Sequence, residues 1–357
     1  MVSPKTYPTV AMLVAAHLWL PATLRAEPYL ALRTGLKCSQ CHVNRTGGGG
    51  RNAFGSAWAQ TMLPMRTSAV RSRSLNDWIS IGADLRALVR ARARRPASSP
   101  RLPRTALEMS EAQLQVEARF VPNRLALYVD ETLGPGQALA REAFVLVEAL
   151  PATGYAKAGK FLLPYGWRLW DDEAAIRSET RFTYAAPDIG LEIGAEPGPL
   201  SWSVAVTNGT GAAAEDDDGK MVTSSAALVF PRFRIGASGS RNTVGAGSRK
   251  VFGGFGGFAV GGLAVLAEAD WIMDGIDQFV AYAEGDFLIR KGWNVKLAYG
   301  YHDPDVDVAQ DQGTRLRAGL EAFPVSFVQL SGYYVRFDRP GRPDDEDRLS
   351  IEVHLHF

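Results

Sequence analysis

RLSIEVHLHF, residues 348–357, ends the chain in a strict alternation of polar and apolar side chains. Leu349 and every second residue through Phe357 are apolar, and they share one face because successive side chains of a strand point to opposite sides. Arg348, His354 and His356 belong to the opposite, polar face. A last strand with one wholly apolar face and a terminal aromatic residue predicts a strand that lies between lipid and a polar lumen.

The same period-two pattern extends back along the chain to residue 79. With the final strand, it predicts about 16 strands, an even number as a bacterial barrel requires. The predicted strands lie near 79–93, 112–120, 125–129, 142–149, 155–162, 187–195, 201–207, 221–229, 232–239, 250–260, 262–272, 279–289, 293–301, 314–321, 325–337 and 348–357.

Connections between these strands fall into two classes. Short turns lie at Val121–Asn123, Arg290–Gly292 and Ala322–Pro324. Longer polar loops are predicted at Arg94–Ser110, Asn208–Lys220, His302–Gly313 and Asp338–Asp347. Short periplasmic turns with long outer loops indicate a mostly β chain, folded as a transmembrane antiparallel β-barrel. A soluble β-sandwich is the alternative, because period two alone does not distinguish a protein core from lipid.

Cys38-Ser39-Gln40-Cys41-His42 spells C-x-x-C-H, the attachment sequence for c-type haem, and contains both cysteines of the chain. Two thiols at this spacing can each add to a vinyl group of one porphyrin, and the next imidazole can reach the iron. We therefore expect one covalent haem c with His42 as its proximal ligand. A disulfide, a redox-active cysteine pair and half of a zinc site are the alternatives. A zinc site usually needs a second cluster, which the sequence lacks.

Residues 1–26 read as a secretory signal peptide. Lys5 supplies the positive charge of its n-region. Val10–Leu24 is apolar enough for its h-region but short for a membrane-spanning helix. Cleavage after Ala26 would leave Glu27 first, and export agrees with haem attachment outside the cytoplasm. The domain prediction is thus a signal peptide at 1–26, a haem segment at 27–74 and a barrel at 75–357.

The haem segment is too short to bury a core by itself. Gly47–Gly50 allows the chain to turn sharply beside the cofactor. Phe54 and Trp58, four residues apart, are predicted to share a helix face and pack on the porphyrin. Since the segment precedes the first strand, we expect it on the periplasmic side, plugging the lumen.

The second axial ligand of the iron has several candidates in the sequence. Met62 and Met65 follow the motif, and methionine with histidine is a common axial pair. His354 and His356 face the predicted lumen and are the alternative. An open or water-bound position is the third possibility.

The charged residues indicate less about function than the C-x-x-C-H motif does. The formal net charge of +1 offers no argument for nucleic acid. Four lumen-facing arginines are candidates for an anion path or for holding haem propionates: Arg86, Arg90, Arg119 and Arg124. Carboxylates gather in the predicted outer loops and would attract ferrous iron or bridging divalent ions: Glu215, Asp216, Asp217, Asp218, Asp303, Asp305, Asp307, Asp311, Asp344, Asp345, Glu346 and Asp347.

Together, the signal peptide, an early C-x-x-C-H and a barrel ending in Phe357 resemble the fused monohaem cytochrome and porin proteins of iron-oxidising bacteria. Within the barrel, 158–166 (AGKFLLPYG) is similar to a stretch of polyanion-selective porins. The resemblance implies an outer-membrane protein of a Gram-negative bacterium that oxidises extracellular Fe(II) and passes electrons to a periplasmic cytochrome or other carrier. The alternative is a solute porin, anion-conducting, whose haem segment is a plug or redox sensor.

Overall fold

The computed structural model describes residues 27–95, 104–136, 138–211, 215, 218–245, 247–338 and 345–357. The predicted signal peptide, residues 1–26, lies outside the described residues, as do several predicted loop carboxylates, Asp216, Asp217 and Asp344 among them. Among the residues described, no helix has the length and apolar character needed to span a membrane.

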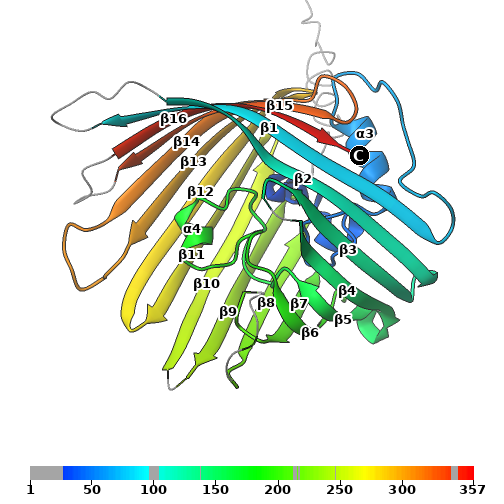
Figure 1. Cartoon of the computed structure of the whole chain (residues 1–357), viewed down its shortest axis with the longest axis horizontal. Coiled ribbons are helices and arrows are strands. Elements are labelled where there is room, and N and C mark those ends of the chain that lie inside the picture. Colours follow the sequence, from blue (N-terminus) through cyan, green and yellow to red (C-terminus); the bar gives the residue numbers. More distant parts are fainter. Residues whose placement is uncertain are drawn as a thin grey trace, which may run out of the picture.

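Sixteen antiparallel strands close into one barrel, in which each strand pairs with its neighbours in sequence and β1 pairs with β16 (Figure 1). This confirms the predicted fold and strand number. The strands are β1 (Ile79–Arg95), β2 (Arg104–Val121), β3 (Leu125–Gly134), β4 (Leu139–Leu150), β5 (Gly154–Phe161), β6 (Asp188–Ala195), β7 (Leu200–Thr207), β8 (Met221–Phe230), β9 (Phe233–Val244), β10 (Gly247–Val260), β11 (Leu263–Asp274), β12 (Ile276–Arg290), β13 (Trp293–Asp303), β14 (Gly313–Ala322), β15 (Val328–Asp338) and β16 (Asp345–His356).

The closing strand has the predicted alternation. Leu349, Ile351 and Val353 are exposed on the outer surface, whereas His354 and His356 are buried toward the lumen. The backbone N–H of Phe357 donates to the carbonyl of Ala83 at 2.8 Å, so the ladder with β1 continues to the last residue. The exposed apolar residues of this and other strands form the lipid-facing surface.

One predicted loop is shorter than expected. Between β1 and β2 the connection spans 96–103 rather than Arg94–Ser110. The strands continue past their apolar section because the backbone ladder needs no apolar side chains, and Arg90 pairs with Glu108 at 3.1 Å in the extension. Period two in apolar residues marks only the part of a strand that faces lipid.

Two segments occupy the lumen. The first, which we call the plug, comprises α2 (Pro28–Thr34), the short helix η2 (Cys38–Gln40) and α3 (Ala53–Met62). The second, the inward loop, is 162–187 between β5 and β6, and it contains α4 (Ala175–Ser178), which lies against β11, β12 and β13. The remaining helix, η3 (Pro151–Thr153), is a short turn between β4 and β5. Figure 1 shows α3 beside the C-terminus, at the end where β1 begins.

Plug, inward loop and wall share one buried apolar cluster. Tyr29, Leu30 and Leu32 of α2 belong to it together with Tyr165 and Trp167 of the inward loop. A barrel of this kind that conducts water has a polar interior, whereas this lumen contains a packed core. The plug is therefore part of the folded barrel, as the sequence predicted for the haem segment's position.

Candidate cofactor site

The C-x-x-C-H motif forms a tight turn at the centre of the plug. The carbonyl of Cys38 accepts hydrogen bonds from the backbone N–H of Cys41 at 3.1 Å and of His42 at 2.9 Å. The glycines then reverse the chain, with Gly47, Gly48 and Gly49 at positive φ, so that His42 and Arg51 form an antiparallel bridge. A Cβ at Gly47 would also lie 3.3 Å from the Cys38 sulfur. The glycine run thus has the turning role that the sequence predicted.

Helix α3 packs directly on this turn. Its N-cap, Asn52, accepts from the backbone N–H of Gly55 at 2.9 Å through its side-chain oxygen. A Cβ at Gly55 would lie 2.1 Å from the Cys41 carbonyl oxygen, so only glycine fits there. The helix holds Trp58 toward the motif.

The barrel wall holds the plug through buried polar contacts on several strands. Asn44 donates to Glu142 of β4 at 2.5 Å and accepts from Lys157 of β5 at 2.9 Å. From helix α2, Arg33 donates to the carbonyl of Asp286 at 2.8 Å, and Tyr29 donates to Glu321 at 3.0 Å. Buried partners on β4, β5, β12 and β14 fix the height of the plug in the lumen.

Cys38, Cys41 and His42 line one cavity between the plug and the inward loop. Its empty space is about 1240 Å³, part of it open to solvent. Aromatic and aliphatic side chains predominate, and the lining comes from the plug, the inward loop and β5, β7, β8, β9 and β10: Leu36, Trp58, Tyr155, Pro164, Tyr165, Trp167, Trp202, Val229 and Phe255 are among them.

The chemistry of the donor set fits a covalent haem. Both cysteines are free thiols, and the Nδ1 atom of His42 is buried without a hydrogen-bond partner among the described residues. Burial lowers the pKa of His42 to about 4, which leaves the imidazole neutral, as a metal ligand must be. Cys38, Cys41 and His42 would hold the haem, and the aromatic lining would exclude water from it.

Cys41 does not have the environment of the activated thiol of a redox-active cysteine pair. Such pairs work through a thiol whose pKa is lowered by nearby positive charge or a helix N-terminus. Here burial, with a contribution from Cys38, raises the pKa of Cys41 to about 11. Among the described residues no group of three or more His, Cys, Asp or Glu side chains could hold a metal ion, so no structural zinc site is visible there either.

None of the four predicted distal ligands lines this cavity. Met62 ends α3, and Met65 lies at the barrel rim, where its N–H donates to the Phe323 carbonyl at 2.8 Å. Among the described residues that line the cavity, His42 is the only histidine and there is no methionine. The identity of the second axial ligand stays a prediction.

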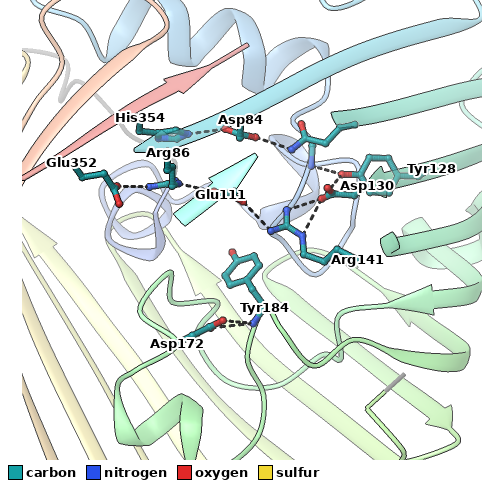
Figure 2. A network of polar contacts seen from close by, with 12 residues as sticks. Asp84, Arg86, Glu111, Tyr128, Asp130, Arg141, Asp172, Tyr184, Glu352 and His354 are labelled. Carbon is teal, nitrogen blue, oxygen red and sulfur yellow. Dashed lines mark hydrogen bonds and ion pairs between the residues drawn. The ribbon is translucent and has the colours of Figure 1, made fainter. Parts of the chain in front are cut away.

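The two C-terminal histidines belong to the lumen wall. Figure 2 shows His354 beside Asp84, with 2.8 Å between its Nε2 and the carboxylate, and Nδ1 lies 3.0 Å from Gln329. His356 Nδ1 lies 3.4 Å from Arg51 of the plug. Both ring nitrogens of His354 are therefore engaged with protein groups.

A polar network extends from β16 to β4 across the lumen wall (Figure 2). Its ion pairs follow the order Glu352, Arg86, Glu111, Arg141 and Asp130, with separations of 2.7–3.1 Å. Arg141 also lies over the ring of Tyr184 in the inward loop, 5.3 Å from its centroid.

Three of the four arginines predicted for an anion path or for propionates are already paired. Arg86 has Glu111 and Glu352, Arg90 has Glu108, and Arg119 has Glu117 at 3.1 Å. Arg124 is exposed near the Val121–Asn123 turn. The cavity instead contains Arg234 and Arg168, which the alternation did not single out.

The predicted aromatic pair of α3 divides between two cavities. Trp58 lines the cavity of the motif, as expected, but Phe54 is 53% exposed and lines a second cavity beside the short turn at Val121–Asn123. The prediction that both pack on one cofactor face is wrong for Phe54. His42 lines both cavities.

No protein-family model and no curated protein sequence matches this chain. Several solved structures, however, are similar to it. A loop-deletion mutant of the outer-membrane protein OmpT of Vibrio cholerae aligns with a TM-score of 0.61 and 14% identity, covering 78% of this chain and 99% of that one. The anion-selective porin from Comamonas acidovorans gives 0.59 and 11% over 78% and 99%. The outer-membrane channel DcaP of Acinetobacter baumannii gives 0.56 and 12% over 78% and 97%.

These similarities extend over nearly the whole of each solved barrel and, at such low identity, describe the fold. The soluble-sandwich alternative is excluded by the closed barrel with its apolar outer surface. The chain has the fold of the outer-membrane porins, a closed antiparallel β-barrel with an apolar outer surface.

Proposed function

We propose that this protein transfers electrons across the outer membrane through one haem bound covalently at Cys38 and Cys41 in the barrel lumen. The supporting observation is that the only two cysteines of the sequence and the adjacent His42 line one mostly apolar cavity inside the barrel. When bound, the haem would supply a one-electron carrier. The chain's own residues hold it, shield it from water and close the lumen.

The position of the cavity supports this function. Residues of the inward loop and of the plug both line it, and Lys37 of the plug donates to the carbonyls of Glu196 and Gly198 in the short turn between β6 and β7. A bilayer insulates the two compartments, so a carrier inside the lumen shortens the distance that an electron must cross. His42 also lines the second cavity beside the short turn at Val121–Asn123, which offers a route from the motif to the periplasmic side.

External ferrous iron is the proposed donor, and a periplasmic cytochrome or other carrier is the proposed acceptor. Asp305, Asp307 and Asp311 lie on the outer connection between β13 and β14, next to Asp303 at the end of β13, and their negative charge attracts cations. They do not form a metal cluster among the described residues, so they would attract iron rather than store it.

A solute channel is the second candidate. It is favoured by the similar solved structures, whose names include an outer-membrane channel and an anion-selective porin. The packed core formed by the plug and the inward loop weighs against a wide path for solutes. Conductance in planar bilayers separates the two: open-channel currents from haem-loaded protein support the channel, and a closed barrel supports electron transfer.

The direct test uses lipid vesicles that contain the full-length protein and trapped ferricyanide, with Fe(II) citrate outside and a potassium carrier to balance charge. Each external Fe(II) loses one electron and each trapped ferricyanide gains one, so the yellow absorbance fades without mixing of the two solutes. We expect fading with the natural protein and none with the Cys38→Ala, Cys41→Ala double variant.

Sedimenting the vesicles provides the control. Ferricyanide that appears in the supernatant, equally for natural and double-variant protein, identifies a solute channel and rejects the proposed function. Absence of covalent haem, measured as the mass of the denatured chain and by its visible spectrum, rejects the proposal at the first step.

A further inference from the structure

Arg234 is a buried cation beside the motif. It projects from β9 into the cavity, is 7% exposed, and places its guanidinium 3.9 Å from the Cys38 sulfur through Nη1. Nη2 donates to the Leu36 carbonyl at 2.9 Å, and Cζ lies 5.4 Å from the Trp167 ring centroid. Its Nε is buried and has no hydrogen-bond partner among the described residues.

The positive charges around Arg234 exceed the carboxylates available to them. Lys37 and Arg45 also line the cavity, and Glu196 and Glu148 are the nearby acids. Arg45 pairs with Glu148 at 2.9 Å and reaches Glu196 at 3.7 Å. Burial lowers the pKa of Lys37, and both Arg234 and Arg45 act in the same direction against Glu196. Three cations share two carboxylates, and Arg234 has no carboxylate within 4.0 Å in the part of the chain that is described.

A buried guanidinium without a counter-ion is costly unless another anion joins it. The cavity that it faces is the proposed haem site, and a haem carries two carboxylate side chains, the propionates. Arginine presents a planar fork of donors that matches a carboxylate with two hydrogen bonds.

We propose that Arg234 binds a haem propionate and thereby orients the cofactor on Cys38 and Cys41. This inference rests on the proposed function, since it requires the haem. The Arg234 guanidinium replaces the lumen arginines that the sequence indicated for this role, because Arg86, Arg90 and Arg119 have their own acidic partners. Arg124 is exposed and does not line this cavity.

Arg168 of the inward loop has a similar environment. It lines the same cavity, donates to the Leu163 carbonyl at 2.6 Å and leaves its buried Nε without a partner among the described residues. Asp172 lies near enough that Arg168 lowers its pKa, although burial raises that pKa overall. Because Asp172 partly compensates Arg168, we assign Arg234 the stronger role and Arg168 that of the second propionate partner.

The test compares Arg234→Gln with Arg234→Lys and with Arg241→Gln, which removes an exposed charge from the same strand. Heat-dependent gel mobility checks that each barrel is folded, and the haem-to-protein ratio checks loading. The readouts are the propionate bending band in the resonance Raman spectrum and the reduction potential.

In Arg234→Gln the propionate loses its cation, so the band shifts and the oxidised haem is favoured. At a fixed ambient potential the reduced-to-oxidised ratio falls about tenfold, which corresponds to about 59 mV for a one-electron couple. Arg234→Lys keeps the positive charge, so most of the reduction potential is retained. A lysine cannot form two parallel hydrogen bonds with one carboxylate, so the propionate bending band still shifts. Arg241→Gln changes neither readout.

An unchanged band in folded, haem-loaded Arg234→Gln overturns the inference while the proposed function stands. If that variant does not fold, Arg234→Lys decides by the same band: a shift supports propionate binding and no shift rejects it. Natural protein without haem rejects the proposed function itself, so the two failures are distinguishable.

Discussion

At the scale of single residues, Asp171 is the main anchor of the inward loop. Its two carboxylate oxygens accept from Arg315 of β14 at 2.6 and 3.0 Å, and Arg317 lies at 3.1 Å. Burial raises the pKa of Asp171, but Arg317 and Arg315 outweigh it and lower the pKa to about 2. One buried carboxylate thus compensates two arginines that the wall presents to the lumen.

Asp171→Asn should therefore destabilise the folded protein by about 3–5 kcal/mol, since Arg317 and Arg315 both lose this buried carboxylate and Arg315 keeps only Glu173 at 4.0 Å. Glu173→Gln is the matched control, because Glu173 is half-exposed where it pairs with Arg348, and its loss should cost about 1 kcal/mol or less. Thermal unfolding in detergent measures both. Equal effects in the two variants would contradict this role for Asp171.

The contact of Asp171 with Arg315 and Arg317 also makes the stability of the inward loop depend on pH. A carboxyl whose folded pKa lies below its unfolded value contributes stability above about pH 4, and loses it as the pH falls through about 2. Natural protein should therefore retain the protease resistance of the inward loop at pH 4 and lose it near pH 2. Limited proteolysis over this range, with Asp171→Asn as the variant that lacks the transition, provides the measurement.

At the scale of elements, the plug depends on α2. Pro28 begins this helix at a position that suits proline, and Gly35 ends it with φ of 67°, closed by a hydrogen bond to Ala31 at 2.9 Å. Leu32 lies against β10, where a Cβ at Gly257 would come within 2.7 Å of its methyl group. Seven residues would not form a stable helix in water, so packing against the wall maintains α2.

Leu32→Ala should lower the stability of plug docking by about 2–5 kcal/mol and leave the barrel closed. Residues 27–74 should resist protease in natural protein and become sensitive in the variant, with unchanged heat-dependent gel mobility. Phe54→Ala is the control, since Phe54 is exposed. Rapid removal of the segment from natural protein, with the barrel intact, would contradict the plug.

At the scale of the whole molecule, the barrel presents opposite chemistry on its two faces. On β6, Ile189, Leu191 and Ile193 are exposed outward, while Glu192 between them is buried in the lumen and pairs with Lys157 at 3.0 Å. Outside the barrel this arrangement suits hydrocarbon, and inside it supports ion pairs and the plug.

Leu191→Arg places a charge in the lipid-facing band and should cost about 2–4 kcal/mol if the residue lies near the bilayer midplane. Val308→Arg, on an outer connection, should cost close to nothing. Equilibrium unfolding of protein inserted in lipid vesicles measures the difference. A similar cost for both would place the bilayer elsewhere on the barrel.

By itself, the sequence was sufficient for the strands, their number and the lumen-facing side of β16. Each of these depends on alternation along one segment, which the backbone of an extended strand imposes locally. The C-x-x-C-H motif is local as well, since two thiols and an imidazole within five residues specify one attachment turn. A turn that brings these three side chains together was therefore predictable, and the structure places all three at one cavity. The role of His42 as proximal ligand stays a prediction.

Tertiary structure alone decided how the lumen is filled and which cation is free for a ligand. Residues 162–187 fold inward because Tyr165 and Asp171 find partners on β11 and β14, more than a hundred positions away. Arg86 pairs with Glu352 across the closure of the barrel, whereas Arg234 contacts the Leu36 carbonyl, the Cys38 sulfur and the Trp167 ring. Ion pairing between strands depends on register and closure, and alternation along one strand contains no information about the neighbour that a side chain will face.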